Sequence, residues 1–351
     1  MKLFSCYKNL LAAAFLYCFS LQGCSQVPSA KESAVSDVSY TDGKIKGLSF
    51  VASPRLVSEQ EILKVSGVNA NWVTLMPYGF VRSIDSPQVQ YNNQRQWKGE
   101  RIDGIKEVAN LFRKQGIKVM IKPQLWMGHG SFTGHLEMKT EAAWKMFEDG
   151  YKKYILDFAK AAEETGCEML CIGTELNNFI KARPVFWDTL ISQVKRVYRG
   201  KLTYAENWDS FDKVPFWPQL DYIGIDAYFP LSDEEKFTVK ALERGWEKHK
   251  KQITFISGKV GKPVLFTEYG YRSSLFAAKE PWAELNNEVC LENQEAALKA
   301  LYNSFWKEKW FAGGFLWKWY DNPNAGGNSN TDYTPQNKPA EKLVKETYNK
   351  H

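Results

Sequence analysis

One pattern recurs along this chain from about residue 44 onward: a helical segment stops at a glycine, and a short apolar stretch follows at once. Glycine accepts the left-handed backbone conformation that closes a helix, so each such glycine predicts a junction from helix to strand. Strands preceded by such a glycine are expected at 68–76, 117–125, 167–175, 201–208 and 262–269. Three further apolar stretches, at 46–51, 220–228 and 311–319, complete a set of eight expected strands.

Helical segments fill the gaps between these strands. Capping boxes at Ser58 and Ser232, each with a glutamate three residues later, predict two helix starts, and Pro184 predicts a third at a first-turn position. Further helices are expected over 101–115, 140–165, 288–309 and 339–350. Eight strands that alternate with helices, without a domain break, favour the α/β class and a single (β/α)8 TIM barrel over an open doubly wound sheet.

The amino-terminal segment predicts export and anchoring. In residues 1–23, two lysines flank the start of a leader whose apolar run, 10–21, is too short to span a membrane. The run ends in Leu-Gln-Gly-Cys, which resembles the signal of bacterial lipoproteins and implies cleavage before Cys24 and lipid chains on that cysteine. Residues 24–43 are polar and are expected to form a flexible tether to a barrel over 44–351. The expected location is therefore the cell envelope, with a lipid anchor in a membrane.

Composition excludes several classes of function. The formal net charge is only +6, and no basic stripe with interleaved aromatic residues indicates nucleic-acid binding. Beyond the leader, the cysteines are Cys167, Cys171 and Cys290; the first two lie on one expected strand, roughly 13 Å apart, too far for a disulfide. We expect buried thiols. Histidines are too sparse for a metal site, and no nucleotide fingerprint is present, so neither a metal nor a cofactor is expected.

Two of the expected strands end on a glutamate. An apolar run from residue 264 leads to Glu268, and a similar run from residue 169 leads to Glu175. Ligands of parallel α/β folds bind at the carboxyl ends of the strands, so we expect the two carboxyl groups to face each other across one cleft. The long segments that follow strands, including 77–100 and 270–287, lie on the same face.

The ends of the other strands carry amides, carboxylates and indoles, which suit a polyhydroxylated ligand because sugars need polar contacts and flat apolar platforms. Tyr228 is expected to donate a hydrogen bond to Glu268. Lys122 has an alternative role, in which it neutralises a carboxylate inside the barrel. The candidate substrate-binding residues are Lys122, Gln124, Trp126, His129, Asn177, Asn207, Trp208, Asp226, Tyr228, Trp317 and Trp319. Packing is the alternative for the aromatic members of this set.

Trp317 and Trp319 are the candidates for the floor of the subsite that holds the reacting sugar. Alternate residues of a regular strand share a face, so we expect both indoles on one side of the sheet. The pattern leaves open which of the two forms the floor.

Four of the strand-end motifs resemble glycoside hydrolase family 113 of clan A, which consists largely of bacterial endo-β-1,4-mannanases. They are Gly-Thr-Glu-Leu at 173–176, Tyr-Ala-Glu-Asn-Trp at 204–208, Gly-Ile-Asp-Ala-Tyr at 224–228 and Phe-Thr-Glu-Tyr-Gly at 266–270. The resemblance runs from about residue 44 to 348 and implies that Glu175 is the acid/base and Glu268 the nucleophile. Much of the clan has asparagine before the acid/base, where this chain has Thr174, so Asn177 or Asn207 would have to contact the sugar 2-hydroxyl.

The expected function is cleavage of a β-1,4-linked mannan-type polysaccharide by a retaining hydrolase. Two carboxyl groups roughly 5 Å apart allow double displacement through a covalent glycosyl-enzyme. One alternative is a retaining hydrolase of another β-glycan, such as glucan or xylan. The other alternative is a glycan-binding lipoprotein without catalytic activity. The presence of both Glu175 and Glu268 argues against it.

Overall fold

The computed structural model describes residues 37–351, so Cys24, the predicted signal and most of the predicted tether lie outside the described residues. Tyr40, near the end of the predicted tether, packs on the barrel. Its N–H donates to the carbonyl of Lys309 at 2.8 Å, and its ring centroid lies 5.9 Å from that of Tyr222. Contacts with the barrel therefore begin before residue 44.

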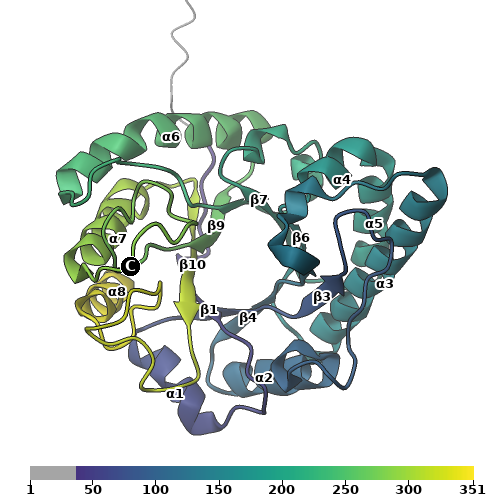
Figure 1. Cartoon of the computed structure of the whole chain (residues 1–351), viewed down its shortest axis with the longest axis horizontal. Helices are drawn as coiled ribbons and strands as arrows, with labels where there is room; N and C mark the ends of the chain where they lie inside the picture. The colour runs from purple at the N-terminus through teal and green to yellow at the C-terminus, as the bar shows by residue number, and fades with distance from the viewer. Residues whose placement is uncertain (1–36) are drawn as a thin grey trace, which may run out of the picture. The chain divides into compact units, whose positions relative to one another are not determined.

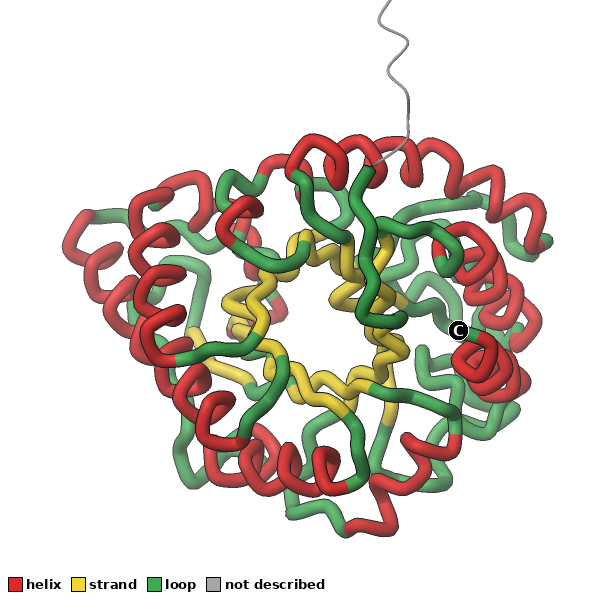
Figure 2. The backbone as a smooth tube through the Cα atoms, turned by 180° about the vertical axis from the view of Figure 1, so that it is seen from behind, coloured by secondary structure: helices red, strands yellow, loops and turns green. Residues whose placement is uncertain are grey.

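Parallel strands form a closed barrel in the order β1–β10–β9–β8–β7–β6–β4–β2, and helices surround it (Figure 1 and Figure 2). The barrel strands are β1 (Ile45–Phe50), β2 (Trp72–Leu75), β4 (Lys118–Ile121), β6 (Met169–Thr174), β7 (Lys201–Asn207), β8 (Ile223–Asp226), β9 (Val264–Tyr269) and β10 (Phe311–Trp319). The helices are α1 (Glu59–Gly67), α2 (Ile102–Lys114), α3 (Glu141–Thr165), α4 (Asn177–Ala182), α5 (Pro184–Val197), α6 (Val239–Val260), α7 (Leu291–Phe305) and α8 (Pro339–Lys350). The predicted (β/α)8 barrel is confirmed.

Pro123 interrupts the strand that we expected over 117–125, and Pro77 follows the strand that we expected over 68–76. Pro77 follows β2 and Pro123 follows the end of β4, and proline has no N–H to donate to a ladder. Beyond these breaks, β3 (Tyr78–Val81) and β5 (Gln124–Met127) pair with each other as a separate parallel sheet of two strands. This small sheet extends the wall above the barrel on the side of β2 and β4.

Apolar side chains fill the barrel interior at its amino-terminal end. One buried cluster includes Ile45 of β1, Met120 of β4, Leu265 of β9 and Phe315 of β10. Cys171 belongs to the same cluster, and all three cysteines of the described chain are free and buried, as predicted. Because this packing closes the interior from below, polar groups within the barrel are accessible from its carboxyl-terminal mouth.

Two predicted helix starts are confirmed and a third is wrong. Pro184 is the first residue of α5. Ser58 caps α1, and its N–H donates to the Glu61 carboxylate at 2.7 Å. By contrast, α6 begins only at Val239, where the Thr238 hydroxyl accepts from the N–H of Ala241. The capping box at Ser232 does not form a helix because the carbonyl of Glu235 accepts from the N–H of Phe276 and the side chain of Asn293, which belong to later elements. Within residues 37–351, each helix is too short or too polar to cross a membrane.

The glycines before the expected strands differ in conformation. Gly116, Gly166 and Gly261 adopt positive φ, as the helix-to-strand junction predicts, whereas Gly67 does not. Gly261 has φ of 71° and Gly67 ends α1, and an added Cβ at either residue would meet no heavy atom within 4 Å. The two positions therefore differ in backbone conformation and not in available space.

We predict that Gly261→Ala lowers the free energy of unfolding by about 1 kcal/mol, because alanine is strained at positive φ. Gly67→Ala is the matched control and is expected to be neutral or slightly stabilising. Urea unfolding of both variants measures the difference. Equal effects of the two substitutions would contradict the prediction.

Candidate active site

Three hydrogen-bond donors surround the carboxylate of Glu268, near the end of β9. The ammonium of Lys122 lies 2.5 Å from Oε1, and the side-chain amide of Gln124 donates to the same oxygen at 2.9 Å. The hydroxyl of Tyr228 donates to Oε2 at 2.9 Å. These contacts hold both oxygens of Glu268 in place and stabilise a negative charge on them.

Lys122 is fully buried between two carboxylates. Its ammonium lies 3.0 and 3.1 Å from the two oxygens of Asp226, and the Thr267 hydroxyl donates to Asp226 at 2.7 Å. Burial by itself would lower the pKa of Lys122, but the charges of Asp226 and Glu268 raise it overall. Lys122 has 0% of its surface exposed and lies in ion pairs with both carboxylates, which is the arrangement that its alternative role predicts.

Glu175 follows β6 in an unusual backbone conformation. Its φ is 51°, a value that is uncommon outside glycine and is concentrated at functional sites, and its N–H donates to the carbonyl of Ala205 at 2.8 Å. Burial raises the pKa of Glu175 well above its usual range, and the charges of Asp226 and Glu268 raise it further. The raised pKa of Glu175 favours its protonated form, whereas three hydrogen-bond donors surround the carboxylate of Glu268.

Two further carboxyl groups contribute to this electrostatic balance. Burial raises the pKa of Asp226 to about 7, with a further contribution from Glu268. Burial also raises the pKa of Glu206 to about 7, although Glu206 accepts hydrogen bonds from the Asn207 N–H and the Ser210 hydroxyl. A single lysine, Lys122, is in contact with this group of acids among the described residues, so the acids cannot all ionise at neutral pH.

A cavity of about 540 Å³ brings Glu175 and Glu268 together at the carboxyl ends of the strands. Its size falls in the range typical of small-molecule sites. The residues that line it are Tyr78, Gln124, Phe132, Thr174, Glu175, Asn207, Trp208, Asp209, Asp226, Tyr228, Glu268, Trp282 and Trp317. Within residues 37–351, no cluster of His, Cys, Asp or Glu is arranged to hold a metal ion.

Eight of the thirteen predicted site residues line this cavity, and five do not: Lys122, Trp126, His129, Asn177 and Trp319. Trp126 lies on β5, 56% exposed, with its ring edge-on to Tyr78. His129 lies in the loop after β5. Asn177 begins α4 and donates to the Ser210 hydroxyl at 2.6 Å, outside the cavity lining.

Trp317 and Trp319 face different surroundings, so the expectation that they share a face is wrong. Trp317 lines the cavity, whereas Trp319 is 1% exposed and belongs to the core between barrel and helices. The reason is an irregularity in β10: Leu48 pairs with Leu316, but Phe50 pairs with Trp319, which leaves one extra residue in β10. Such a bulge reverses the alternation of side chains.

Five lining residues were not among the predicted site residues: Tyr78, Phe132, Thr174, Asp209 and Trp282. Trp282 lies in the long segment 270–287, which was expected on this face. The length of that segment could therefore have indicated that Trp282 lies near the cavity. Tyr78 directly follows Pro77, which ends β2. Thr174, where the clan often has asparagine, also lines the cavity, and its buried hydroxyl has no hydrogen-bond partner among the described residues.

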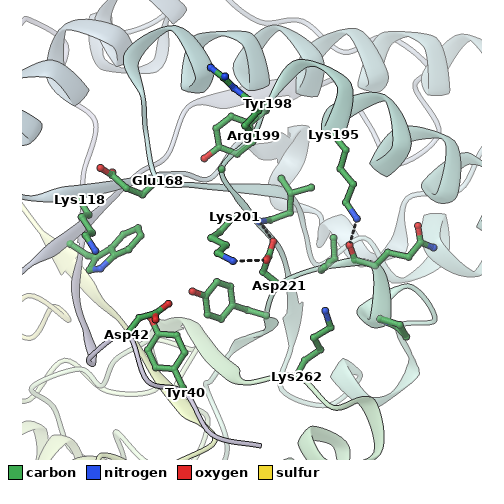
Figure 3. A pocket seen from close by; sticks show the side chains of 17 residues that line it. Tyr40, Asp42, Lys118, Glu168, Lys195, Tyr198, Arg199, Lys201, Asp221 and Lys262 are labelled. Atoms are coloured by element: carbon green, nitrogen blue, oxygen red, sulfur yellow. Dashed lines mark hydrogen bonds and ion pairs between the residues drawn. The ribbon is translucent and has the colours of Figure 1, made fainter.

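A larger cavity of about 760 Å³ lies at the other mouth of the barrel (Figure 3). Lys118 and Lys201, the first residues of β4 and β7, line it. Its polar groups are partly paired: Lys201 lies 3.0 Å from Asp221, and Lys195 donates to the carbonyl of Gln219 at 2.6 Å. Because the two glutamates belong to the carboxyl ends of the strands, the smaller cavity is the candidate active site.

Barrel, cleft and paired glutamates together define a glycoside hydrolase of the TIM-barrel class. The sequence model of Glycoside Hydrolase Family 113 matches residues 55–338, and this chain belongs to that family. No curated protein sequence matches the chain.

Solved structures resemble the whole barrel. The GH113 β-mannanase AaManA from Alicyclobacillus acidocaldarius, in complex with ManMIm, has a TM-score of 0.78 and 25% identity, covering 88% of this chain and 98% of that one. A GH113 β-1,4-mannanase has a TM-score of 0.77 and 23% identity, covering 88% and 100%. The β-glucuronidase of Faecalibacterium prausnitzii has a TM-score of 0.56 and 15% identity, covering 83% and 45%. The last two likenesses, at 23% and 15% identity, show the barrel fold alone.

We predict that Asp226→Asn moves the alkaline limb of the pH profile of kcat/KM to lower pH. Removal of a negative charge near Glu175 favours its ionised form and so lowers its raised pKa. Asp209→Asn is the matched control, since Asp209 lines the same cavity but is not among the charges that raise this pKa. An unchanged limb in Asp226→Asn, or an equal shift in the control, would contradict the prediction.

Proposed function

We propose that this protein is a retaining β-mannanase in which Glu268 is the nucleophile and Glu175 the acid/base. The observation that carries the proposal is the contrast between two carboxyl groups lining one cavity. Three donors hold Glu268, whereas Glu175 has a strongly raised pKa. A retaining hydrolase needs this division, with one ionised and one protonated carboxyl group.

In the first step, an oxygen of Glu268 attacks the anomeric carbon of the sugar while Glu175 gives its proton to the departing glycosidic oxygen. The bond from sugar to leaving group breaks, and an ester to Glu268 forms. Ester formation removes the negative charge of Glu268, which is one of the charges that raise the pKa of Glu175. Glu175 can then take a proton from water, which attacks the same carbon and releases the sugar with its original anomeric configuration.

Other cavity residues are proposed to position the reacting sugar. Trp317 lines the cavity and can stack on a sugar ring, while Tyr228 holds the nucleophile. Asn207 also lines the cavity, and its side-chain amide oxygen Oδ1 accepts from the N–H of Trp208 at 2.9 Å. The NH2 group of the same side-chain amide can donate to the sugar 2-hydroxyl, which favours Asn207 over Asn177 for this contact.

The proposed substrate is a β-1,4-linked mannan-type polysaccharide. Family membership and the names of two structural relatives, a β-mannanase and a β-1,4-mannanase, support it. Release of reducing sugar from mannan, glucomannan, xylan and cellulose tests it, with activity expected on mannan. Activity on xylan without activity on mannan would overturn the substrate, and no activity on any polymer would favour a binding protein.

We predict that Glu268→Ala lowers kcat by about 10³-fold or more, because no other group can form the glycosyl-enzyme. Glu175→Gln is expected to cause a comparable loss on natural substrates, which have poor leaving groups, since glutamine cannot donate the proton. Circular dichroism serves as the control for folding, and proton NMR of the first product tests retention. A near-normal rate in either folded variant would remove that residue from its proposed role.

We further propose that lipid on Cys24 anchors the enzyme in the cell envelope. The support is the Leu-Gln-Gly-Cys sequence at residues 21–24, after an apolar leader. The full-length protein should appear in the membrane fraction of a bacterial expression host and incorporate labelled palmitate. Cys24→Ser should lose the label and leave the membrane fraction, and label retained by that variant would contradict the anchor.

A further inference from the structure

Trp282 is an exposed indole supported by a second indole. It lies in the segment after β9, lines the cavity and is 49% exposed. Its ring stacks on that of Trp208, with centroids 5.5 Å apart and planes at 19°. Trp208 in turn packs against the buried ring of Phe229 at 5.8 Å. Trp208 therefore connects Trp282 to the core, and Trp282 is the more exposed ring of the stack.

Hydrogen bonds hold the backbone around Trp282. The hydroxyl of Tyr333 donates to the carbonyl of Pro281 at 2.5 Å, and the N–H of Ala283 donates to the carbonyl of Glu280 at 2.8 Å. Tyr333 also packs edge-on against Tyr228, with ring centroids 6.2 Å apart. The backbone next to Trp282 is therefore connected through Tyr333 to Tyr228, which donates to Glu268. We call the exposed ring of Trp282 the platform.

The charge of the cavity limits the kind of molecule that can lie on Trp282. Four carboxyl groups line it, those of Glu175, Asp209, Asp226 and Glu268, and the described lining contains neither lysine nor arginine. An anionic sugar would need a cation to replace its lost hydration, so a neutral sugar is favoured. Carboxylates such as Asp209, next in sequence to Trp208, can accept hydrogen bonds from neutral hydroxyl groups.

We propose that Trp282, supported by Trp208, binds a second, neutral sugar unit of a β-linked chain, distinct from the unit that reacts between Glu175 and Glu268. The indole face packs against the C–H face of that sugar. This inference rests on the proposed function and deepens it. It adds a second sugar-binding position to the one where the sugar reacts. Trp208, for which the sequence left both substrate binding and packing open, acts as a positioning residue for Trp282.

The test compares kcat/KM on manno-oligosaccharides from the disaccharide to the hexasaccharide. Trp282→Ala should lower kcat/KM about tenfold for chains long enough to reach the platform and leave the shortest hydrolysed chain nearly unchanged. Trp282→Phe should restore most of the loss, since it keeps an aromatic face. Trp97→Ala is the matched control, because Trp97 is 50% exposed but does not line the cavity, and it should behave like the parent enzyme.

The outcomes separate this inference from the proposed function. Suppose that the parent enzyme cleaves manno-oligosaccharides and that Trp282→Ala leaves the dependence of kcat/KM on chain length unchanged. This result would overturn the role of Trp282 alone. An equal loss at every length would also overturn it, because that result indicates a general disturbance of the cleft. A parent enzyme without activity on any of the four polysaccharides would instead overturn the proposed function. In that case, calorimetric binding of mannohexaose to the parent and to Trp282→Ala still decides whether the platform binds sugar.

Discussion

The site depends on one buried ion pair network, in which the ammonium of Lys122 lies between Asp226 and Glu268. A charge with no exposed surface is tolerated only when partners replace its hydration, and here two carboxylates do so. One positive charge cannot balance all the acids nearby. Burial and the charges of Asp226 and Glu268 raise the pKa of Glu175, whereas the direct contact with Lys122 holds Glu268 in place. The division of labour proposed for the two glutamates rests on this difference in their surroundings.

The backbone creates this arrangement through local departures from a regular barrel. Pro123 stops the ladder directly after Lys122, and the chain resumes in a separate small sheet with Gln124, the second donor to Glu268. The bulge in β10 turns Trp317 toward the cavity. Glu175 itself has positive φ. Such irregularities cost stability in a scaffold and are found where a side chain must be aimed.

The chain combines family features with features of its own. The model of family 113 matches most of the barrel, residues 55–338, whereas sequence identity to the two solved mannanases is 25% and 23%. Thr174 stands where much of clan A has asparagine, and its hydroxyl has no described partner. The stacked rings of Trp282 and Trp208 line the same cavity as Glu175 and Glu268. Substrate selection in this fold resides in such segments, because the barrel supports many chemistries through variation of its loops.

The sequence by itself determined the barrel fold and the placement of Glu175 and Glu268 at one end of the barrel. Repeated helix-to-strand junctions and short apolar runs are local patterns, and the carboxyl ends of parallel strands meet on one face whatever the loops do. Gln124, Asn207, Asp226 and Tyr228 were found by the same rule, since each ends or follows a strand. What the tertiary structure decided depends on register and on contacts between distant segments. The exclusion of Trp319, the enclosure of Lys122 and the pairing of Trp282 with Trp208 are of this kind, because a shift of one residue or the path of a long loop decides which face a side chain occupies, and no local pattern encodes either.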